Sequence, residues 1–539
     1  MRTFGRVLAA FILMGLAALT LPSSGSASSE ASDRAIALEQ KRSVYRALTK
    51  EKDTDAMATT ASFVPSSIDC RFDPPDKPNI NLDCDSPIAP HNEPDIEVDP
   101  EDAANMIASS NDYESCCDGF YTTLDAGDSW IVGDMSIEDE NRIGSDPVTV
   151  FDPVTDTAIH SSLNFVCRQV CGDGDLVVSL STDDGVHWGE PVVVAGGIGK
   201  DDSAFQVFHD KEWIVTDTDP QSPFYGRTYL TWTAFVSRFG VYQESPILES
   251  HSDDGGRTWS EPQEISGFHP TCTFQETGRP RECDEDQFSV PTVAPDGSVY
   301  VAFENFQHEA AWEPGELFET QYMVVRSFDG GETWSAPVHV ADLEDGTEDY
   351  PVNVDGRQTL TGFQARVNSA GNVTADPNTG RLYLVFSDNR NGRYDNPGRP
   401  VTNTDVFLST STDGVTWTRP KAVTLKETDQ WFPWVDVDPT TGKIGVLYHD
   451  RRNFNLYDTT LAEGTPGALT FTRINTRPSH PRNSEFFQAG IPSCPECATF
   501  FGDYINIDYD RNGVAQMVWT DMRRFIETGY GENIFYASH

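Results

Sequence analysis

Short apolar runs separated by polar turns occupy most of this chain, and they recur at a regular spacing. Typical runs are Tyr322–Val325, which is followed by the turn residues Asp329 and Gly330, and Leu382–Ser387, which lies between Gly380 and Asp388. Short runs bounded by turn residues predict β-strands rather than helices. Because no long amphipathic helical pattern separates the runs, a regular alternation of strands and helices is not expected. The hydrophobic pattern therefore predicts an all-β fold.

One turn sequence, S-x-D-x-G-x-T-W, repeats along the chain, and we call it the Asp box. It is complete at Ser252–Trp259 and Ser327–Trp334, and Thr123–Trp130, Ser181–Trp188 and Ser411–Trp417 keep most of it. The aspartate can bond nearby backbone amides and the glycine accepts a positive φ, so each copy predicts a hairpin turn, with a Trp that packs between sheets. The structural aspartates of these turns are Asp125, Asp183, Asp254, Asp329 and Asp413.

The same module of strands returns from Glu93 to the C-terminus. Two strands, such as Asn372–Ala375 and Leu382–Ser387, are followed by a loop, a third strand, the Asp box and a fourth strand. Evenly spaced short strands with one turn signal per module predict a β-propeller of seven four-stranded blades, with the Asp-box turns between strands 3 and 4. Six blades are the alternative if the first or the last module is only partial.

The ends of the chain complete this organisation. The sixth module keeps only a degenerate box at Thr460–Gly464, and the seventh stops at its third strand, Asn533–Ala537. A closed ring needs another outer strand, which we expect from the extended, proline-rich segment 63–92, acting as a clasp. Residues 1–27 have the basic start, apolar run and small-residue end of a secretory signal peptide, and 28–62 read as a polar linker or propeptide.

Charge and cysteine content fit an exported protein, either secreted into the extracellular space or periplasmic. The formal net charge is −47 at pH 7, which argues against nucleic acid as a partner and against anionic membrane surfaces. A solvated acidic surface, a high-salt habitat and multivalent-cation binding are all compatible with it. Ten cysteines in an exported chain predict local disulfides. The close pairs are Cys70/Cys84, Cys116/Cys117, Cys167/Cys171, Cys272/Cys283 and Cys494/Cys497.

The repeated S-x-D-x-G-x-T-W box on a predicted propeller resembles the sialidase (neuraminidase) superfamily, also known as Asp-box or BNR-repeat proteins. The resemblance covers about residues 93–539, the expected propeller domain. It implies Asp boxes on the face opposite the active site. It also implies a Tyr nucleophile paired with Glu, an Asp acid/base and three arginines that hold the substrate carboxylate. The Arg-Ile-Pro tripeptide common near the first blade of sialidases does not occur here, so the first of those arginines has no matching position.

The expected function is that of an exo-glycosidase of the neuraminidase type acting on a glycan or glycoconjugate. The alternative is a non-catalytic propeller that binds glycan or protein through the same face, because Asp boxes also occur in propellers that are not sialidases. No cofactor is required for either function, and a Ca²⁺ ion is one option. Insertion into a membrane is not expected.

A second repeat, aromatic-x-Asp-x-Arg, stands at the end of the second strand in three modules. Arginine offers a planar fork that suits a carboxylate or a sulfate, so the three arginines could form a substrate clamp. Alternatively, each arginine bonds its own aspartate and ties neighbouring blades together. The residues of this substrate-binding hypothesis are Arg390, Arg452, Arg523, Asp388, Asp450 and Asp521.

Acidic residues gather where the first strand of each module begins. Crowded carboxyl groups raise one another's pKa, which is how a general acid is made near neutral pH, but they can also bind Ca²⁺ or cap backbone amides. Tyr504, beside Asp503, is the nucleophile candidate by position, Tyr448 is the second, and Asp503 and Asp210 are the acid candidates. The full acidic set is Glu93, Asp146, Asp210, Glu212, Asp286, Asp429 and Asp503.

Overall fold

The structure is a computed structural model, and the protein it shows is all-β, as the hydrophobic pattern predicts. Within the described ranges, helix is confined to the 3₁₀ turn η2, Pro481–Asn483. The structure describes residues 66–68, 79–83, 89–113, 117–137, 142–167, 171–199, 205–273, 279–307, 319–346, 348–352, 357–363, 365–396, 398–424, 426–453, 456–484, 500–523 and 531–539. The expected signal peptide and linker lie outside these residues.

The first half of the chain forms antiparallel sheets in which consecutive strands are neighbours. In the first sheet the order is β1-β6-β5-β4-β3, and in the next, β7 to β10 and β11 to β15 are joined by a parallel contact between β9 and β11. The strands are β1 Ser66–Ile68, β3 His91–Val98, β4 Met106–Asp112, β5 Asp118–Thr123, β6 Trp130–Asp134, β7 Arg142–Asp152, β8 Thr157–Cys167, β9 Cys171–Ser181, β10 Val192–Ala195, β11 Phe205–Thr216, β12 Thr228–Arg238, β13 Val241–Glu244, β14 Ile247–Ser252 and β15 Gln263–Glu264.

The second half repeats four-stranded sheets of the same antiparallel kind. Their orders are β16-β17-β18-β19, β20-β21-β24-β25, β26-β27-β28-β29 and β2-β32-β31-β30, with β22 and β23 as a separate ribbon. The strands are β16 Asp286–Val293, β17 Val299–Gln307, β18 Glu319–Ser327, β19 Val338–Asp342, β20 Val373–Ala375, β21 Leu382–Asp388, β22 Arg393–Tyr394, β23 Pro400–Val401, β24 Asp405–Ser411, β25 Lys421–Ala422, β26 Gln430–Val437, β27 Ile444–Asn453, β28 Leu456–Thr465, β29 Ala468–Arg473, β30 Asn506–Tyr509, β31 Ala515–Asp521, β32 Asn533–Ser538 and β2 Ile80–Asn81.

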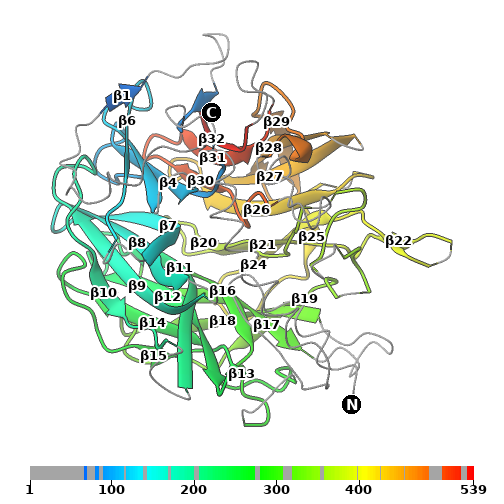
Figure 1. Cartoon of the computed structure of the whole chain (residues 1–539), viewed down its shortest axis with the longest axis horizontal. Helices are drawn as coiled ribbons and strands as arrows, with labels where there is room; N and C mark the ends of the chain where they lie inside the picture. Colours follow the sequence, from blue (N-terminus) through cyan, green and yellow to red (C-terminus); the bar gives the residue numbers. More distant parts are fainter. Residues whose placement is uncertain are drawn as a thin grey trace.

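The sheets follow one another around the centre of the molecule in chain order, from β4 through β12 and β18 to β27 and β31 (Figure 1). The innermost strands β3, β7, β11, β16, β20, β26 and β30 each contact the next, and β30 contacts β3. Side chains join them: Asp95 accepts hydrogen bonds from the Thr149 amide, at 2.9 Å, and from Asn506, at 2.5 Å. Asp508 accepts one from the Val98 amide, at 2.7 Å. The ends of the chain therefore meet around one centre, as in a β-propeller.

A bulge interrupts the innermost strand in several sheets. The register with the second strand shifts at each of these places, and the residue in the bulge has a left-handed backbone although it is not glycine. Such conformations are costly for residues with a Cβ and concentrate at functional sites and bulges. The bulge residues are Glu93 (φ 57°), Asp146 (φ 59°), Lys211 (φ 53°), Phe288 (φ 56°) and Phe432 (φ 52°).

The turn between β14 and β15 is closed by side-chain hydrogen bonds within Ser252–Trp259. Asp254 accepts from the Thr258 amide, at 2.8 Å, and from its hydroxyl, at 2.7 Å. The Trp259 indole donates to the Gly256 carbonyl at 3.0 Å. The same bonds recur between β18 and β19, where the hydroxyl and amide of Thr333 lower the pKa of Asp329. These aspartates are therefore held as hydrogen-bond acceptors within their own turns.

The outer strand beside β32 comes from the N-terminal part of the chain. Ile80 and Asn81 of β2 pair antiparallel with Tyr536 and Phe535, and the Leu82 amide donates to the Ile534 carbonyl at 2.9 Å. Side chains of both segments, including Leu82, lie in one core cluster with Val518 and Trp130. The C-terminal sheet is therefore completed from a part of the chain more than four hundred residues away in sequence.

The structure bears on two further sequence expectations. Thr460–Gly464 is not a turn: it lies inside β28, and the hairpin turns after Thr465, where the φ of Gly467 is 88°. The predicted box was wrong because a Pro-Gly pair, not an Asp-Gly pair, forms this turn. The disulfide Cys272–Cys283 is confirmed. No helix in the described part of the chain is both long and apolar enough to cross a membrane.

Candidate functional site

Charged side chains from different sheets meet where the innermost strands begin. Three of these residues, Glu93, Asp146 and Lys211, are the bulge residues of β3, β7 and β11, which contact one another in that order. We call this group the inner-strand cluster, and its members interact electrostatically with one another. Its residues are Glu93, Asp146, Asp210, Lys211, Glu212, Arg366, Asp503 and Tyr504.

Lys211 lies at the centre of this cluster with a buried side chain, 4% exposed. Its ammonium nitrogen is 4.0 Å from the centre of the Tyr504 ring and 4.1 Å from that of Trp213, so it rests on two aromatic faces. Among the described residues, Nζ has no hydrogen-bond partner. Burial lowers the pKa of Lys211, and the surrounding carboxyl groups act in the opposite direction. The two aromatic rings therefore hold the ammonium in place, while its N–H donors have no hydrogen-bond partner in the described part of the chain.

Arg366 and Asp503 form an ion pair beside Lys211. The guanidinium donates two hydrogen bonds to the carboxylate, of 2.5 Å and 3.3 Å, and it also stacks on the Phe500 ring. Asn368 donates to the Asp503 backbone carbonyl at 3.2 Å. Asp503 thus has a fixed orientation and a permanent positive partner.

Glu93 is buried on the other side of the cluster and accepts a hydrogen bond from Asn111 at 2.5 Å. Burial, followed by the nearby carboxyl groups of Asp146 and Asp503, raises the pKa of Glu93 well above its usual range. Space here is tight, because a Cβ on Gly502 would lie 2.8 Å from the Glu93 backbone nitrogen. The close contact between the Gly502 and Glu93 backbones therefore fixes the position from which the Glu93 side chain extends.

Asp210 and Glu212 flank Lys211 in β11. Burial and then the carboxyl group of Asp146 raise the pKa of both, and that of Asp210 is about 8. Glu212 is fully buried, and within the described residues neither of its carboxyl oxygens has a hydrogen-bond partner. Oδ2 of Asp210 is likewise unpartnered there. An acid that keeps its proton at neutral pH can act as a general acid.

The three catalytic candidates of the sequence analysis, Asp210, Asp503 and Tyr504, therefore lie in one cluster. The Tyr504 hydroxyl has no hydrogen-bond partner among the described residues, and burial followed by Asp146 and Glu93 raises its pKa well above the usual value. Tyr448 lies in β27, outside the cluster, and burial also raises its pKa.

Two of the acidic residues expected at the strand starts have other partners. Asp286 accepts a hydrogen bond from Asn305 at 2.6 Å, and Asp429 forms an ion pair with Arg451. Each of these carboxyl groups therefore has a partner within its own sheet, although Oδ2 of Asp286 has none among the described residues. The acidic residues of the sequence analysis thus divide into those of the inner-strand cluster and these two.

The arginines of the aromatic-x-Asp-x-Arg repeat are engaged in ion pairs. Arg390 bonds Asp388 at 2.5 Å, and Arg523 bonds Asp521 at 2.7 Å. Each thus contacts the aspartate two residues before it, which was the alternative to a clamp. Burial leaves little of the Arg523 guanidinium for a ligand, since its side chain is 3% exposed, whereas that of Arg390 is 27% exposed.

The third pair of that repeat is arranged differently. Arg452 bonds Asp458 at 2.7 Å rather than its own Asp450, and Asp450 pairs with Lys426. The Arg452 side chain is 34% exposed, more than the other two arginines. Asp458 therefore already pairs with the positive charge of Arg452 that a substrate carboxylate would need.

Sequence reasoning missed the two cations of the inner-strand cluster. Lys211 was visible as a lysine between the acidic residues Asp210 and Glu212, which is a weak signal on its own. Arg366 lies between β19 and β20, in a loop without any repeat motif. Only the fold brings Arg366 to Asp503, which is 137 residues further along the chain.

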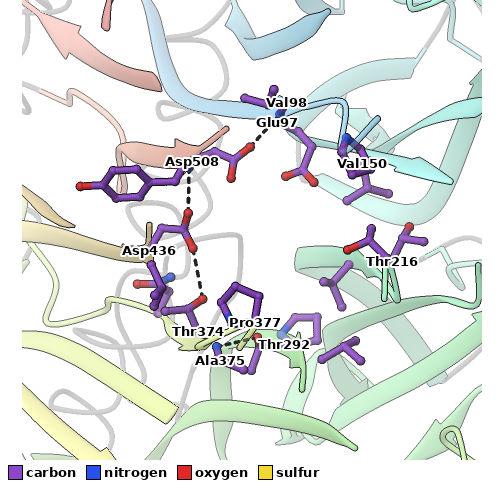
Figure 2. A pocket seen from close by; sticks show the side chains of 18 of the residues that line it. Glu97, Val98, Val150, Thr216, Thr292, Thr374, Ala375, Pro377, Asp436 and Asp508 are labelled. Atoms are coloured by element: carbon purple, nitrogen blue, oxygen red, sulfur yellow. Dashed lines mark hydrogen bonds between the residues drawn. The ribbon is translucent and has the colours of Figure 1, made fainter. Parts of the chain in front are cut away.

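A cavity of about 520 Å³ lies at the opposite end of the innermost strands. Figure 2 shows Glu97, Thr216 and Asp436 around this space, each from a different strand. Burial, and then the neighbouring carboxyl group of Asp508, raises the pKa of Glu97, while burial raises that of Asp436 to about 6. This end is acidic too, but Asp436 and Asp508 are used in hydrogen bonds to the backbone of neighbouring strands.

A separate group of carboxyl oxygens is close enough to hold a cation. Glu319, Glu344 and Asp349 each offer an oxygen atom, and these atoms lie within 4.8 Å of one another. Oxygen ligands at such spacing suit a hard cation such as Ca²⁺. Glu319 begins β18, so the group lies apart from the inner-strand cluster in sequence and in sheet.

Comparison with known proteins gives no family. No family model matches the chain, and no curated protein matches it. Among solved structures, a protein of unknown function from Dyadobacter fermentans aligns at 12% identity and TM-score 0.44, covering 75% of this chain and 96% of its own. A GH93 α-L-arabinofuranosidase of Fusarium graminearum aligns at 12% identity and TM-score 0.42, covering 66% and 88%.

A Hadza microbial sialidase aligns at 15% identity and TM-score 0.39, covering 73% of this chain and 68% of its own. These proteins include glycan-acting hydrolases, and their similarity to this chain is too low to transfer the role of any residue.

Proposed function

We propose that this chain is an exported β-propeller enzyme that acts on glycans as an exo-glycosidase, with the inner-strand cluster as its active site. The observation that carries the proposal is the convergence of Asp210, Glu212 and the Arg366–Asp503 pair at one end of the innermost strands. Glycoside hydrolysis needs a protonated acid for the leaving group and an ionised carboxylate nearby. The cluster offers both within one buried site.

The roles follow from the surroundings of each carboxyl group. Asp210, with a pKa of about 8, would keep its proton at neutral pH and donate it to the glycosidic oxygen. Asp503, fixed by its ion pair with Arg366, would stabilise the positive charge that develops on the sugar ring. Lys211 interacts electrostatically with both of these carboxyl groups.

An exo-glycosidase of the neuraminidase type is the specific form of this proposal. In that form Tyr504 is the nucleophile and would lose its proton to a neighbouring acidic group, of which Asp146 acts most strongly on Tyr504. We expect Tyr504→Phe to abolish turnover in this case, whereas a mechanism based on carboxyl groups alone would retain it. Arg452→Ala tests the proposed clamp at the most exposed of its three arginines.

The proposed architecture is a seven-bladed propeller, supported by the ring of innermost strands from β3 to β30. The turns at Ser252–Trp259 and Ser327–Trp334 are then its Asp boxes, between the third and fourth strands of their sheets. Segment 63–92 is the clasp, because β2 supplies the outer strand beside β32. Residues 1–27 are proposed as the export signal and 28–62 as a linker or propeptide.

The test is turnover of a panel of chromogenic aryl glycosides, α-sialosides included, by the purified chain. We expect one or more substrates to be cleaved, and Asp210→Asn to lower kcat/KM by about 10²-fold or more, the usual effect of removing a general acid. Glu332→Gln is the matched control, since Glu332 is 66% exposed on an Asp-box turn. Binding without turnover of any substrate would favour the alternative, a non-catalytic glycan- or protein-binding propeller.

The proposed reaction requires no cofactor, because side chains supply both the acid and the carboxylate. We therefore expect treatment with EDTA to leave kcat/KM of the wild-type chain unchanged. A fall in melting temperature under the same treatment, abolished in Glu344→Gln, would mark a structural cation at Glu319, Glu344 and Asp349. Loss of turnover on chelation would contradict the cofactor-free mechanism.

A further inference from the structure

The inner-strand cluster contains more acidic than basic groups. It has five carboxyl groups and two cationic groups within mutual electrostatic range. The carboxyl groups belong to Glu93, Asp146, Asp210, Glu212 and Asp503, and the cationic groups to Lys211 and Arg366. A ligand that enters this site therefore meets an excess of acidic groups.

Both cations of the cluster face carboxyl groups of the protein itself. Nε and Nη2 of the Arg366 guanidinium donate hydrogen bonds to Asp503. Lys211 is 4% exposed, rests on the rings of Trp213 and Tyr504, and is surrounded by carboxyl groups, although its ammonium has no hydrogen-bond partner among the described residues. A substrate carboxylate that approached Lys211 would therefore approach the protein's own acids as well.

The described residues of this cluster give no surplus of positive groups to an anion. Five carboxyl groups face two cations, and burial raises the pKa of Glu93, Asp210 and Glu212. A carboxylate clamp needs positive groups in excess of negative ones, whereas here the acidic groups outnumber the cations.

Buried polar atoms without partners point to a ligand rich in hydroxyl groups. Among the described residues, the ammonium of Lys211, both carboxyl oxygens of Glu212, Oδ2 of Asp210 and the Tyr504 hydroxyl lack hydrogen bonds, and all four residues are more than nine-tenths buried. Unpartnered buried polar groups are costly and usually mark an absent partner. A sugar hydroxyl can both donate and accept, so a neutral sugar can satisfy this mixed set of donors and acceptors.

We propose that the sugar bound at the inner-strand cluster is uncharged, and that sugars bearing a carboxylate are excluded from it. The inference rests on the proposed function, since it names the substrate class of the same site. It departs from the neuraminidase form of that proposal, whose substrate carries a carboxylate.

The experiment compares matched aryl glycosides that differ only in the oxidation state of C6, namely a glucoside with a glucuronide and a galactoside with a galacturonide. Aryl α-L-arabinofuranoside and aryl α-sialoside complete the panel, and binding of the parent sugars is measured by saturation-transfer NMR. We expect the neutral member of each productive pair to be favoured in kcat/KM by about 100-fold at low salt and neutral pH, because like charges brought together in an interface cost several kcal/mol.

A charge variant separates electrostatic exclusion from simple shape. Asp146 is half-buried, and Asp146→Asn replaces its carboxyl group by an amide of nearly the same volume. We expect this variant to narrow the neutral-to-acidic ratio by about tenfold, whereas Glu332→Gln on an Asp-box turn should leave the ratio unchanged. An unaltered ratio in Asp146→Asn would overturn the electrostatic explanation.

The outcomes distinguish this inference from the proposed function. Preferred cleavage of the sialoside or of a uronide would uphold the glycosidase proposal and overturn the uncharged substrate. Binding of neutral sugars without any turnover would uphold the uncharged ligand and overturn the glycosidase proposal. Failure to bind or cleave either class would overturn both.

Discussion

The carboxyl group of Asp210 links the chemistry of the cluster to the pH dependence of the protein. Its pKa of about 8 lies above the usual value near 3.8, because the group is buried and faces Asp146. Between these two pH values the folded chain holds a proton that the unfolded chain releases. The contribution to stability is therefore complete below pH 3.8 and is lost as the pH rises through about 8.

We predict that the free energy of unfolding of the wild-type chain falls between pH 5 and pH 9, and that Asp210→Asn has a flatter profile. The difference between the two profiles should be roughly 1–3 kcal/mol, the usual size of the effect for a buried carboxyl group without a partner. Chemical denaturation at several pH values measures it. A variant profile as steep as that of the wild type would show that Asp210 does not titrate in this range.

Gly502 is the residue at which backbone geometry most directly limits the site. Its φ is 82°, and an added Cβ would lie 2.8 Å from the Glu93 nitrogen. Gly467 has a similar φ of 88° but nothing within 4 Å of an added Cβ. Alanine at Gly467 should therefore cost only the left-handed conformation, roughly 1–2 kcal/mol. We predict a larger loss of unfolding free energy for Gly502→Ala, together with reduced turnover, and equal losses in the two variants would contradict this.

At the same scale, the sequence predicted part of the cluster for a physical reason. Asp210 and Asp503 stand next to the start of an apolar strand, and the repeat places such starts at one end of a ring. Arg366 could not be predicted, because its contact with Asp503 depends on a loop that carries no periodic pattern. Lys211 was overlooked because a lysine among acids usually indicates a solvated surface, whereas here it is buried on two aromatic rings.

At the scale of the elements, the predicted strands agree with the structure where alternation is regular. The predicted strands Asn372–Ala375 and Leu382–Ser387 match β20 and β21 to within one residue at each end. Other innermost strands extend beyond their apolar stretch: Val148–Asp152 is only the second half of β7, which starts at Arg142. The bulge at Asp146 shifts the register, so the inward and outward positions no longer alternate and the strand could not be followed past it.

The short strand β2 stabilises the C-terminal sheet more than its length suggests. Leu82, directly after β2, is 1% exposed and packs in one cluster with Ile534 and Tyr536. We predict that Leu82→Ala lowers the free energy of unfolding by about 2–5 kcal/mol, as large-to-small changes in a core do. Leu124→Ala is the control, since Leu124 is 47% exposed. Similar effects of both changes on urea denaturation would show that the segment does not brace the sheet.

At the scale of the whole molecule, the large negative charge affects the stability of the folded chain. The formal net charge of −47 means that folding brings many like charges together, and this self-repulsion favours the unfolded chain. Monovalent salt screens repulsion between exposed charges, since the Debye length falls from about 30 Å at 0.01 M to about 3 Å at 1 M. Buried groups such as Glu212 are affected much less, because water and ions do not reach them.

We therefore predict that raising NaCl from about 0.05 M to about 0.5 M increases the melting temperature by a few degrees, consistent with roughly 1–2 kcal/mol of relieved repulsion. KCl at the same concentrations should act equally, because screening depends on ionic strength and not on the identity of the cation. Differential scanning calorimetry in both salts measures the effect. A melting temperature that is unchanged or falls would contradict charge repulsion as a destabilising factor. A rise in only one salt would instead indicate a cation bound at a specific site.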